Sequence, residues 1–333
     1  MTVALALFSG GLDSILACRV VAAQGIRVKA VKFVTPFFGY DLLAREAEYV
    51  AWVKKTYDID LMLHDVSAPY LAMLADPPHG YGKNFNPCID CKILLLRAAR
   101  ELMDKCKASF LISGEVLGQR PMSQRQDTLR LIARESGCED LLVRPLCAKT
   151  QEPTPVELAG LVDRERLLAF RGRGRQPQMA LAKSFGISEY PMPAGGCVLT
   201  EQAQAGRIAW YYGRKWPVNV SDMLLLLFGR HFQLPHGGWL SLGRDQAENE
   251  RIAALHEGRG YLLGMEERPG PLALLRYSEH PEDLAAAAAL VVRYGKKVKE
   301  GSPAATVKLS SEAGEQRLTA EPLADEIFQG WYL

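Results

Sequence analysis

The hexapeptide SGGLDS at residues 9–14 has the residue types of a phosphate-binding turn. Its two glycines let the backbone turn tightly and present N–H groups outward. A helix start carries partial positive charge, which favours a pyrophosphate at that point. Its serine hydroxyls can donate to phosphate oxygens, and its carboxylate can hold a Mg²⁺ ion that bridges them. The sequence therefore predicts phosphate binding here, in preference to an ordinary turn capped by Ser and Asp. The residues expected to bind phosphate in this turn are Ser9, Gly10, Gly11, Asp13 and Ser14.

Three cysteines form a second group with chemical potential. Cys88 and Cys91 make a CxxC in the segment NPCIDCK, at the opening of an expected helix over 89–107. The helix dipole is expected to lower thiol pKa values there. Far downstream, PAGGCVLT places Cys197 on a glycine turn. The alternative is that the CxxC is simply the start of a helix and that Cys197 is an unrelated cysteine in a turn. The other four cysteines have the contexts of small core residues: Cys18, Cys106, Cys138 and Cys147.

These motifs resemble a known family. SGGLDS looks like the PP-loop of the N-type ATP pyrophosphatases, parallel-sheet enzymes that cleave ATP between its α and β phosphates and adenylate a carbonyl or carboxyl oxygen. A Walker P-loop and a GxGxxG are both absent from the sequence. An NPxxxC segment entering a helix, followed by a GxC turn, looks like the tRNA 2-thiouridylases. That resemblance implies that Cys91 assists sulfur transfer and that Cys197 carries a persulfide.

Cys88 departs from the commonest pattern of that family. CxxC plus one distant cysteine also resembles thiolases in which three cysteines hold a [4Fe–4S] cluster with one iron left open, and an open iron can carry sulfide. Cys88, Cys91 and Cys197 would then be metal ligands. The persulfide relay and the cluster both stay open at this stage. Zinc is the weaker alternative, because the chain offers no clear second CxxC.

The elements that must position these residues alternate between strand and helix. Apolar runs at 2–8, 27–34, 59–65, 110–114 and 140–146 predict strands, with helical patterns between them. This order predicts an α/β, HUP-like domain with a parallel sheet over residues 1–165. Open sheets of this kind bind ligands at the carboxyl ends of their strands. We therefore add Phe33 and Gly114, near the ends of two strands, to the expected ATP-binding residues.

The pattern changes after residue 150. A connecting segment over 166–222 carries the third active-site cysteine, and a smaller α+β domain is predicted over 223–333. Within that domain, LGRDQAENE (242–250) and AALVVRYGKKVKE (287–299) resemble parts of the NFACT RNA-binding domain, although the expected histidine-bearing segment between them is not obvious. A rival interpretation is a solvated basic face. The residues expected to contact RNA are Arg171, Arg173, Arg175, Arg244, Lys296 and Lys297.

Composition limits the partners. The 333 residues carry a formal charge of +2 and are 48% hydrophobic, which excludes disorder and a globally basic nucleic-acid binder. An 18-residue apolar run and a signal-peptide pattern are both absent, so a membrane partner is not expected. Seven dispersed cysteines favour thiol or metal chemistry in a reducing cytoplasm over a disulfide framework.

Together these observations predict an ATP-dependent RNA uridine thiolation enzyme, acting on tRNA or another structured RNA. It would adenylate the base carbonyl oxygen with ATP and Mg²⁺ and take sulfur from a donor protein or sulfide. One alternative is a PP-loop ligase or amidotransferase that adenylates a small molecule. The other is a non-catalytic RNA-binding protein.

Overall fold

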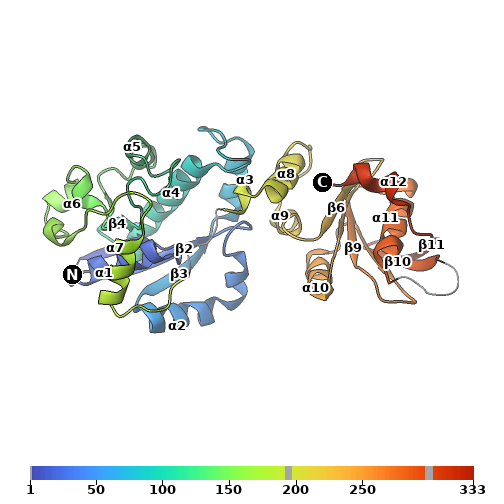
Figure 1. Cartoon of the computed structure of the whole chain (residues 1–333), viewed down its shortest axis with the longest axis horizontal. Coiled ribbons are helices and arrows are strands. Elements are labelled where there is room, and N and C mark those ends of the chain that lie inside the picture. Colours follow the sequence, from blue (N-terminus) through green and yellow to red (C-terminus); the bar gives the residue numbers. More distant parts are fainter. Residues whose placement is uncertain (1, 192–196, 297–302) are drawn as a thin grey trace. The chain divides into compact units, whose positions relative to one another are not determined.

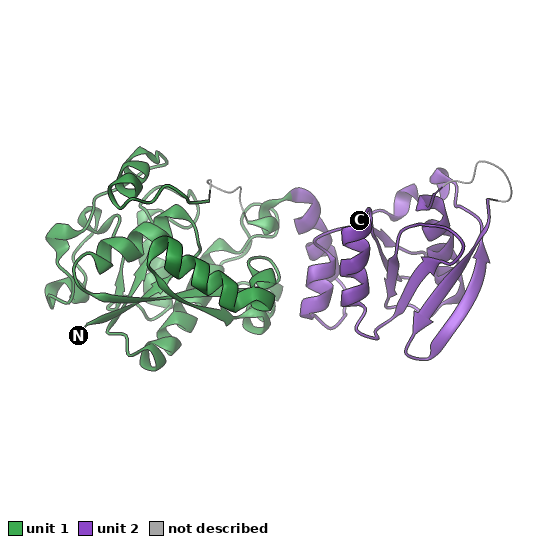
Figure 2. Ribbon diagram, turned by 90° about the horizontal axis from the view of Figure 1, so that it is seen from below, with its two compact units in different colours: residues 1–201 green, residues 202–333 purple. Residues whose placement is uncertain are grey.

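The chain forms two compact units, residues 1–201 and 202–333 (Figure 2). The computed structural model describes residues 2–191, 197–296 and 303–333. The sequence analysis divided the chain into three parts, with limits at residues 165 and 222. That finer division stays a prediction. Among the described residues, no helix combines the length and apolarity needed to cross a bilayer.

Unit 1 is built on a five-stranded sheet in the order β3-β2-β1-β4-β5. Its strands β2, β3 and β4 are labelled in Figure 1. Every neighbouring pair runs parallel, which confirms the predicted α/β fold. The strands are β1 (Val3–Leu7), β2 (Arg27–Val34), β3 (Asp60–Asp65), β4 (Phe110–Ser113) and β5 (Leu142–Val143).

Helices cover both faces of this sheet, because alternate residues of a strand point to opposite sides. In β1, Ala4 and Ala6 pack with α1 (Leu12–Ala22), α2 (Glu46–Tyr57) and α7 (Gln176–Ser184). Leu5 packs on the other side with α4 (Cys88–Cys106) and α5 (Gln126–Glu135). The remaining helices of the unit are α3 (Ser67–Ala75), α6 (Pro155–Leu158) and the 3₁₀ turns η1 (Tyr40–Arg45), η2 (Ala148–Thr150), η3 (Arg164–Arg166) and η4 (Val198–Thr200).

The strand order places a topological switch point between β1 and β4. The chain leaves β1 toward β2 and β3, then crosses back to add β4 on the other side of β1. The loops after β1 and β4 therefore part at the carboxyl edge of the sheet, which is where open α/β sheets bind ligands. The loop after β1 is the SGGLDS segment.

Unit 2 is an antiparallel sheet in the order β11-β10-β8-β9-β7-β6, flanked by helices, as the predicted α+β class requires. Its core joins Leu242, Leu263 and Leu309 of the sheet to Leu290 and Val291 of α11. Its strands are β6 (Arg230–Gln233), β7 (Trp239–Leu242), β8 (Tyr261–Met265), β9 (Ala273–Arg276), β10 (Ala305–Ser311) and β11 (Gly314–Ala320). Its helices are α8 (Gln202–Tyr212), α9 (Val220–Leu225), α10 (Gln246–Leu255), α11 (Pro281–Tyr294), α12 (Asp325–Phe328) and the 3₁₀ turn η5 (Gln329–Trp331).

The contact between Gly114 and α1 generates the first prediction. A Cβ at Gly114 would lie 2.6 Å from the Asp13 carbonyl carbon and from the Ser14 nitrogen. Because both are backbone atoms of a packed helix, Gly114→Ala should lower the free energy of unfolding of unit 1 by about 1–3 kcal/mol. Scanning calorimetry measures this. Gly174→Ala, where a Cβ meets nothing within 4 Å, is the control, and equal stability of the two variants would contradict the prediction.

Candidate functional site

The loop between β1 and α1 has an open, glycine-based geometry. Gly10 adopts a φ of +87°, a conformation that disfavours any other residue. Gly11 caps α1 with extended backbone, and within the described residues no side chain caps this helix. The Ser14 hydroxyl donates to the Gly11 carbonyl at 2.7 Å, and the Ser9 hydroxyl donates to the Ser14 oxygen at 3.2 Å. The first turn of α1 therefore keeps amide donors that a phosphate can use.

A lysine that the sequence analysis missed lies against this loop. The Lys32 ammonium, from β2, donates to the Ser9 carbonyl at 2.6 Å. Burial lowers the pKa of Lys32, and the Asp41 charge partly offsets this. A cation held at the loop would be drawn to a polyphosphate. The only sequence signal was its place near the carboxyl end of a strand adjacent to β1.

The two oxygens of the Asp13 carboxylate differ in their partners. Its Oδ2 accepts from Gln119 Nε2 at 2.7 Å and pairs with Arg175 Nη2 at 3.4 Å. Its Oδ1 is buried without a hydrogen-bond partner among the described residues. An unpaired buried carboxylate oxygen is costly, and it suits a Mg²⁺ ligand, because Mg²⁺ prefers oxygen donors.

Arg175 lies beside the SGGLDS loop, where its guanidinium pairs with Asp13 at 3.4 Å. The RNA contact expected of Arg175 stays a prediction. Arg171 and Arg173 are exposed, and their expected RNA contacts stay predictions.

The two remaining expected ATP-binding residues lie in structural roles. Gly114 makes room for the backbone of α1, and the ATP contact expected at this position stays a prediction. Phe33 is only 5% exposed and packs edge-on against His64, with 5.8 Å between ring centroids. Its side chain belongs to the core, and an ATP contact at this position stays a prediction.

Two distant segments bring the three cysteines together. Cys88 and Cys91 occupy the first turn of α4, and Cys197 directly precedes η4. The segments are tied by the Phe85 amide, which donates to the Leu199 carbonyl at 3.2 Å. A second tie runs from Asn84 Nδ2 to the Thr200 carbonyl at 2.7 Å.

Tyr70 lies at the centre of this thiol cluster, as we call Cys88, Cys91 and Cys197. The Tyr70 side chain, on α3, is 1% exposed. Burial raises its pKa far above the usual value, and negative charge on Cys91, Cys197 and Cys88 adds to the effect. The Tyr70 hydroxyl also forms a hydrogen bond with Cys91. The sequence analysis did not identify Tyr70, because the residues next to it in the sequence form no recognisable functional motif.

Burial outweighs the helix dipole at these thiols. Burial raises the pKa of Cys91 to about 11, although Lys92 and the Tyr70 hydrogen bond act in the opposite direction. Burial also raises the pKa of Cys197, while the Leu199 amide and the charge of Arg120 act against the rise. The expected lowering of thiol pKa at the start of α4 is therefore wrong for Cys91. These thiols need a nearby cation or metal to ionise at neutral pH.

The spacing of the thiols bears on which metal they fit. Among the described residues, the three sulfurs do not all lie within 4.8 Å of one another. A tetrahedral zinc with bonds of about 2.3 Å would need its sulfurs closer, at about 3.8 Å. In a cluster of four irons each thiolate binds a different iron, so three thiolates are a donor set that fits a cluster with one open iron. The persulfide relay and the cluster both stay predictions.

A line of contacts joins the thiol cluster to the PP-loop. Lys92, beside Cys91, lies 3.8 Å from Glu115 Oε1, and Glu115 directly follows Gly114. Burial would raise the pKa of Glu115, but Arg144 at 3.0 Å and Lys92 outweigh it, so this pKa is lowered. The carboxyl end of β4 thus contacts α1 through Gly114 and approaches Lys92, the neighbour of Cys91 in sequence, through Glu115.

In unit 2, the expected RNA-binding residues differ in accessibility. Arg244 is half-exposed, but its guanidinium is bound to Glu248. Lys296 is exposed. Lys297 lies outside the described residues. The GRDxxxN segment also has a structural role. Asn249 Oδ1 accepts a hydrogen bond from the Leu272 amide at 2.9 Å. A Cβ at position 243 would collide with this oxygen, so the contact requires Gly243.

The fold and the loop define unit 1 as an α/β domain with a parallel sheet and a glycine-rich loop after its first strand. Residues 2–160 match the family model described as thiamine biosynthesis protein (ThiI). Residues 229–332 match the model described as NFACT protein RNA binding domain. These two matches confirm the predicted resemblances to a PP-loop domain and to the NFACT RNA-binding domain.

No curated protein matches the chain, whereas several solved structures do. One is a predicted subunit of tRNA methyltransferase from Methanocaldococcus jannaschii, at 16% identity over 64% of this chain and 89% of that one, with a TM-score of 0.39. A 4-thiouridine synthetase–RNA complex with bound ATP matches at 20% identity over 56% and 52%, with a TM-score of 0.35. The U34-tRNA thiolase NcsA from Methanococcus maripaludis, with its [4Fe-4S] cluster, matches at 14% identity over 67% and 70%, with a TM-score of 0.32.

The Arg244–Glu248 pair gives a prediction of pH dependence. Hydrogen bonds from the Arg244 side chain and backbone lower the pKa of Glu248 to about 2. Since the unfolded value is about 4.3, the pair's contribution to stability is complete above about pH 5 and is lost as the pH falls toward 2. Glu248→Gln should therefore lower the free energy of unfolding of unit 2 by about 2 kcal/mol at pH 7. It should also make that free energy depend less on pH in the acid range. The exposed Glu250→Gln is the control, and parallel acid limbs in all three proteins would refute the prediction.

Proposed function

We propose that this protein thiolates a uridine of tRNA in the cytoplasm at the expense of ATP. One observation carries the proposal: Cys88, Cys91 and Cys197 gather around Tyr70 in the unit that also holds the SGGLDS loop. An activating loop alone would suit any PP-loop ligase. Three converging thiols joined to it through Lys92 and Glu115 favour sulfur transfer.

In the first step, the SGGLDS loop and the start of α1 bind the phosphates of ATP. Lys32 and Arg175 supply positive charge, and Asp13 offers its vacant Oδ1 to Mg²⁺. The uridine carbonyl oxygen attacks the α-phosphorus, and pyrophosphate leaves. This converts a poor leaving group on the base carbon into AMP.

In the second step, sulfur replaces AMP. In a relay, the terminal sulfur of a Cys197 persulfide attacks the base carbon, and AMP leaves with the electron pair of the C–O bond. The Cys91 thiolate then attacks the Cys197 sulfur, and the S–S electron pair goes to the sulfur on the base. The products are a thiocarbonyl and a Cys91–Cys197 disulfide, which a dithiol must reduce. The Tyr70 hydroxyl, hydrogen-bonded to Cys91, stabilises its thiolate.

In the cluster alternative, Cys88, Cys91 and Cys197 would hold a [4Fe–4S] cluster. The cluster would supply an open iron that delivers sulfide. Tyr70 then screens the thiolates from water and donates to Cys91. The NFACT RNA-binding domain at residues 229–332 supports tRNA as the substrate, and the sulfur comes from a donor protein or from sulfide.

Asp13→Asn tests the activating step. An amide keeps the Gln119 contact but is a much weaker Mg²⁺ ligand, so pyrophosphate release should fall at least about a hundredfold with the melting temperature unchanged. Pyrophosphate release with tRNA and sulfide is the measurement. Asp127→Asn, an exposed carboxylate on α5, is the matched control. Wild-type release by the Asp13 variant would remove the PP-loop assignment.

The substrate is tested in the same reaction mixture. Nucleosides from the treated tRNA, separated and weighed by mass spectrometry, should contain an ATP-dependent thiouridine. ATP cleavage that ignores every tRNA fraction but responds to a small carboxylic acid or amine would establish the ligase alternative instead.

Cys88→Ser separates the relay from the cluster. The cluster predicts that protein purified without oxygen loses its iron and nearly all thiolation when Cys88 is replaced. The relay needs only Cys91 and Cys197, so it predicts near-normal activity. Cys138→Ser is the control, since its side chain lies near two carbonyls that a hydroxyl can also reach. A fully active, iron-free Cys88 variant would overturn the cluster.

A further inference from the structure

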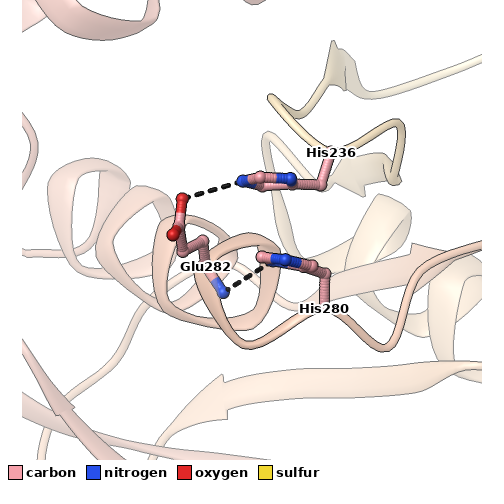
Figure 3. A group of neighbouring side chains, drawn as sticks. All are labelled: His236, His280 and Glu282. Carbon is pink, nitrogen blue, oxygen red and sulfur yellow. Dashed lines mark hydrogen bonds and ion pairs between the residues drawn. The ribbon is translucent and has the colours of Figure 1, made fainter.

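We propose that His236, His280 and Glu282 of unit 2 form a binding site for a divalent transition-metal ion, with Zn²⁺ as the expected occupant (Figure 3). One ligand atom from each residue lies within 4.8 Å of the other two. The residues come from two elements that are apart in sequence, the β6–β7 turn and the start of α11. The proposal does not depend on the function proposed for unit 1.

The turn that carries His236 is fixed to α11 by a buried carboxylate. Asp283 is fully buried, and its two oxygens accept from the backbone amides of His236 at 3.0 Å and Gly238 at 2.9 Å. A Cβ at Gly238 would lie 2.8 Å from Asp283 Oδ2, so this close approach requires glycine. The backbone of the first ligand is therefore held in place before any metal arrives, which lowers the entropy cost of binding.

The second and third ligands are fixed by the start of the helix. His280 is the N-cap of α11, and its Nδ1 accepts from the Glu282 amide at 3.3 Å. That length makes the cap a weak hydrogen bond. The ring can therefore give it up at small cost when a metal ion takes an imidazole lone pair. Glu282 is in the first turn, so its carboxylate lies beside both rings (Figure 3).

His236 and Glu282 already share a hydrogen-bonding proton at the place where a metal would bind. His236 Nε2 lies 2.8 Å from Glu282 Oε2. The two imidazole rings stack with centroids 3.6 Å apart and planes at 12°. Coordination requires these planes to open so that both lone pairs converge, and the exposed side chains allow this. A metal ion would replace the shared proton and bridge nitrogen and oxygen ligands.

The donor set selects the class of metal. Two imidazoles and one carboxylate suit Zn²⁺ and its neighbours among the transition metals, whereas Ca²⁺ and Mg²⁺ prefer oxygen ligands. Three protein ligands leave the fourth position of a tetrahedral ion open to water or to an anionic oxygen. The bound ion would also tie the β6–β7 turn to the start of α11.

Isothermal titration of the full-length, metal-stripped protein with ZnCl₂ tests the site. His280→Asn is the informative variant, because asparagine still caps a helix but carries no imidazole. His236→Asn is the second. Each should weaken one Zn²⁺-binding event by about tenfold or more, with unchanged circular dichroism. His256→Asn, in the same unit but outside the cluster, is the control and should bind as the wild type does.

The thiol cluster of unit 1 is a second place where Zn²⁺ could bind, so the metal must be located. Co²⁺ bound to thiolates gives strong near-ultraviolet charge-transfer absorption, whereas nitrogen and oxygen ligands do not. The proposal expects that His280→Asn removes bound Co²⁺ without changing that absorption. Loss of thiolate absorption only, or equal Zn²⁺ affinity in the wild type and both histidine variants, would overturn it.

Discussion

The packing of Gly114 against the first turn of α1 is the contact on which the candidate site depends. Because position 114 lacks a Cβ, the end of β4 approaches the backbone of Asp13 and Ser14 directly. This contact packs the end of β4 against the first turn of α1, which follows the SGGLDS loop. The next residue, Glu115, lies 3.8 Å from Lys92 at the start of α4. The end of one strand therefore contacts both the helix after the phosphate loop and the helix that carries Cys88 and Cys91.

Charge balance around the loop follows from that geometry. Asp13 carries the one carboxylate of the SGGLDS segment, whose six residues are all described. Gln119 and Arg175 bind one of its two oxygens. Lys32 is desolvated beside the Ser9 carbonyl. Polyphosphate and Mg²⁺ arriving together would satisfy both groups, since each supplies the charge that the other lacks. This complementarity would account for a cation from β2 and an unpaired carboxylate oxygen lying at the same loop.

The sequence predicted the parallel sheet because its strands are apolar runs, and 27–34 matches β2 in both limits. It missed β11, whose residues Gly314–Ala320 are polar because the strand pairs on one side only, at the sheet edge. It also missed α3, a short helix with Pro69 in its first turn. Tyr70, Lys32 and the role of Arg175 were out of reach, since their partners lie far away in sequence. Motifs report local backbone needs, whereas these side chains act through tertiary contacts.

The thiol cluster shows how tertiary burial can reverse a local rule. A helix start should favour thiolates, and by that rule Cys91 would ionise easily. In the folded unit, α3 places the buried Tyr70 against it, and desolvation raises the pKa of Cys91 to about 11. A protonated thiol is a poor nucleophile and a poor ligand. The charges of Lys92 near Cys91 and of Arg120 near Cys197 are already present and do not offset burial. Chemistry at this cluster therefore needs further positive charge, such as a bound metal ion, and without it the thiols stay protonated and unreactive.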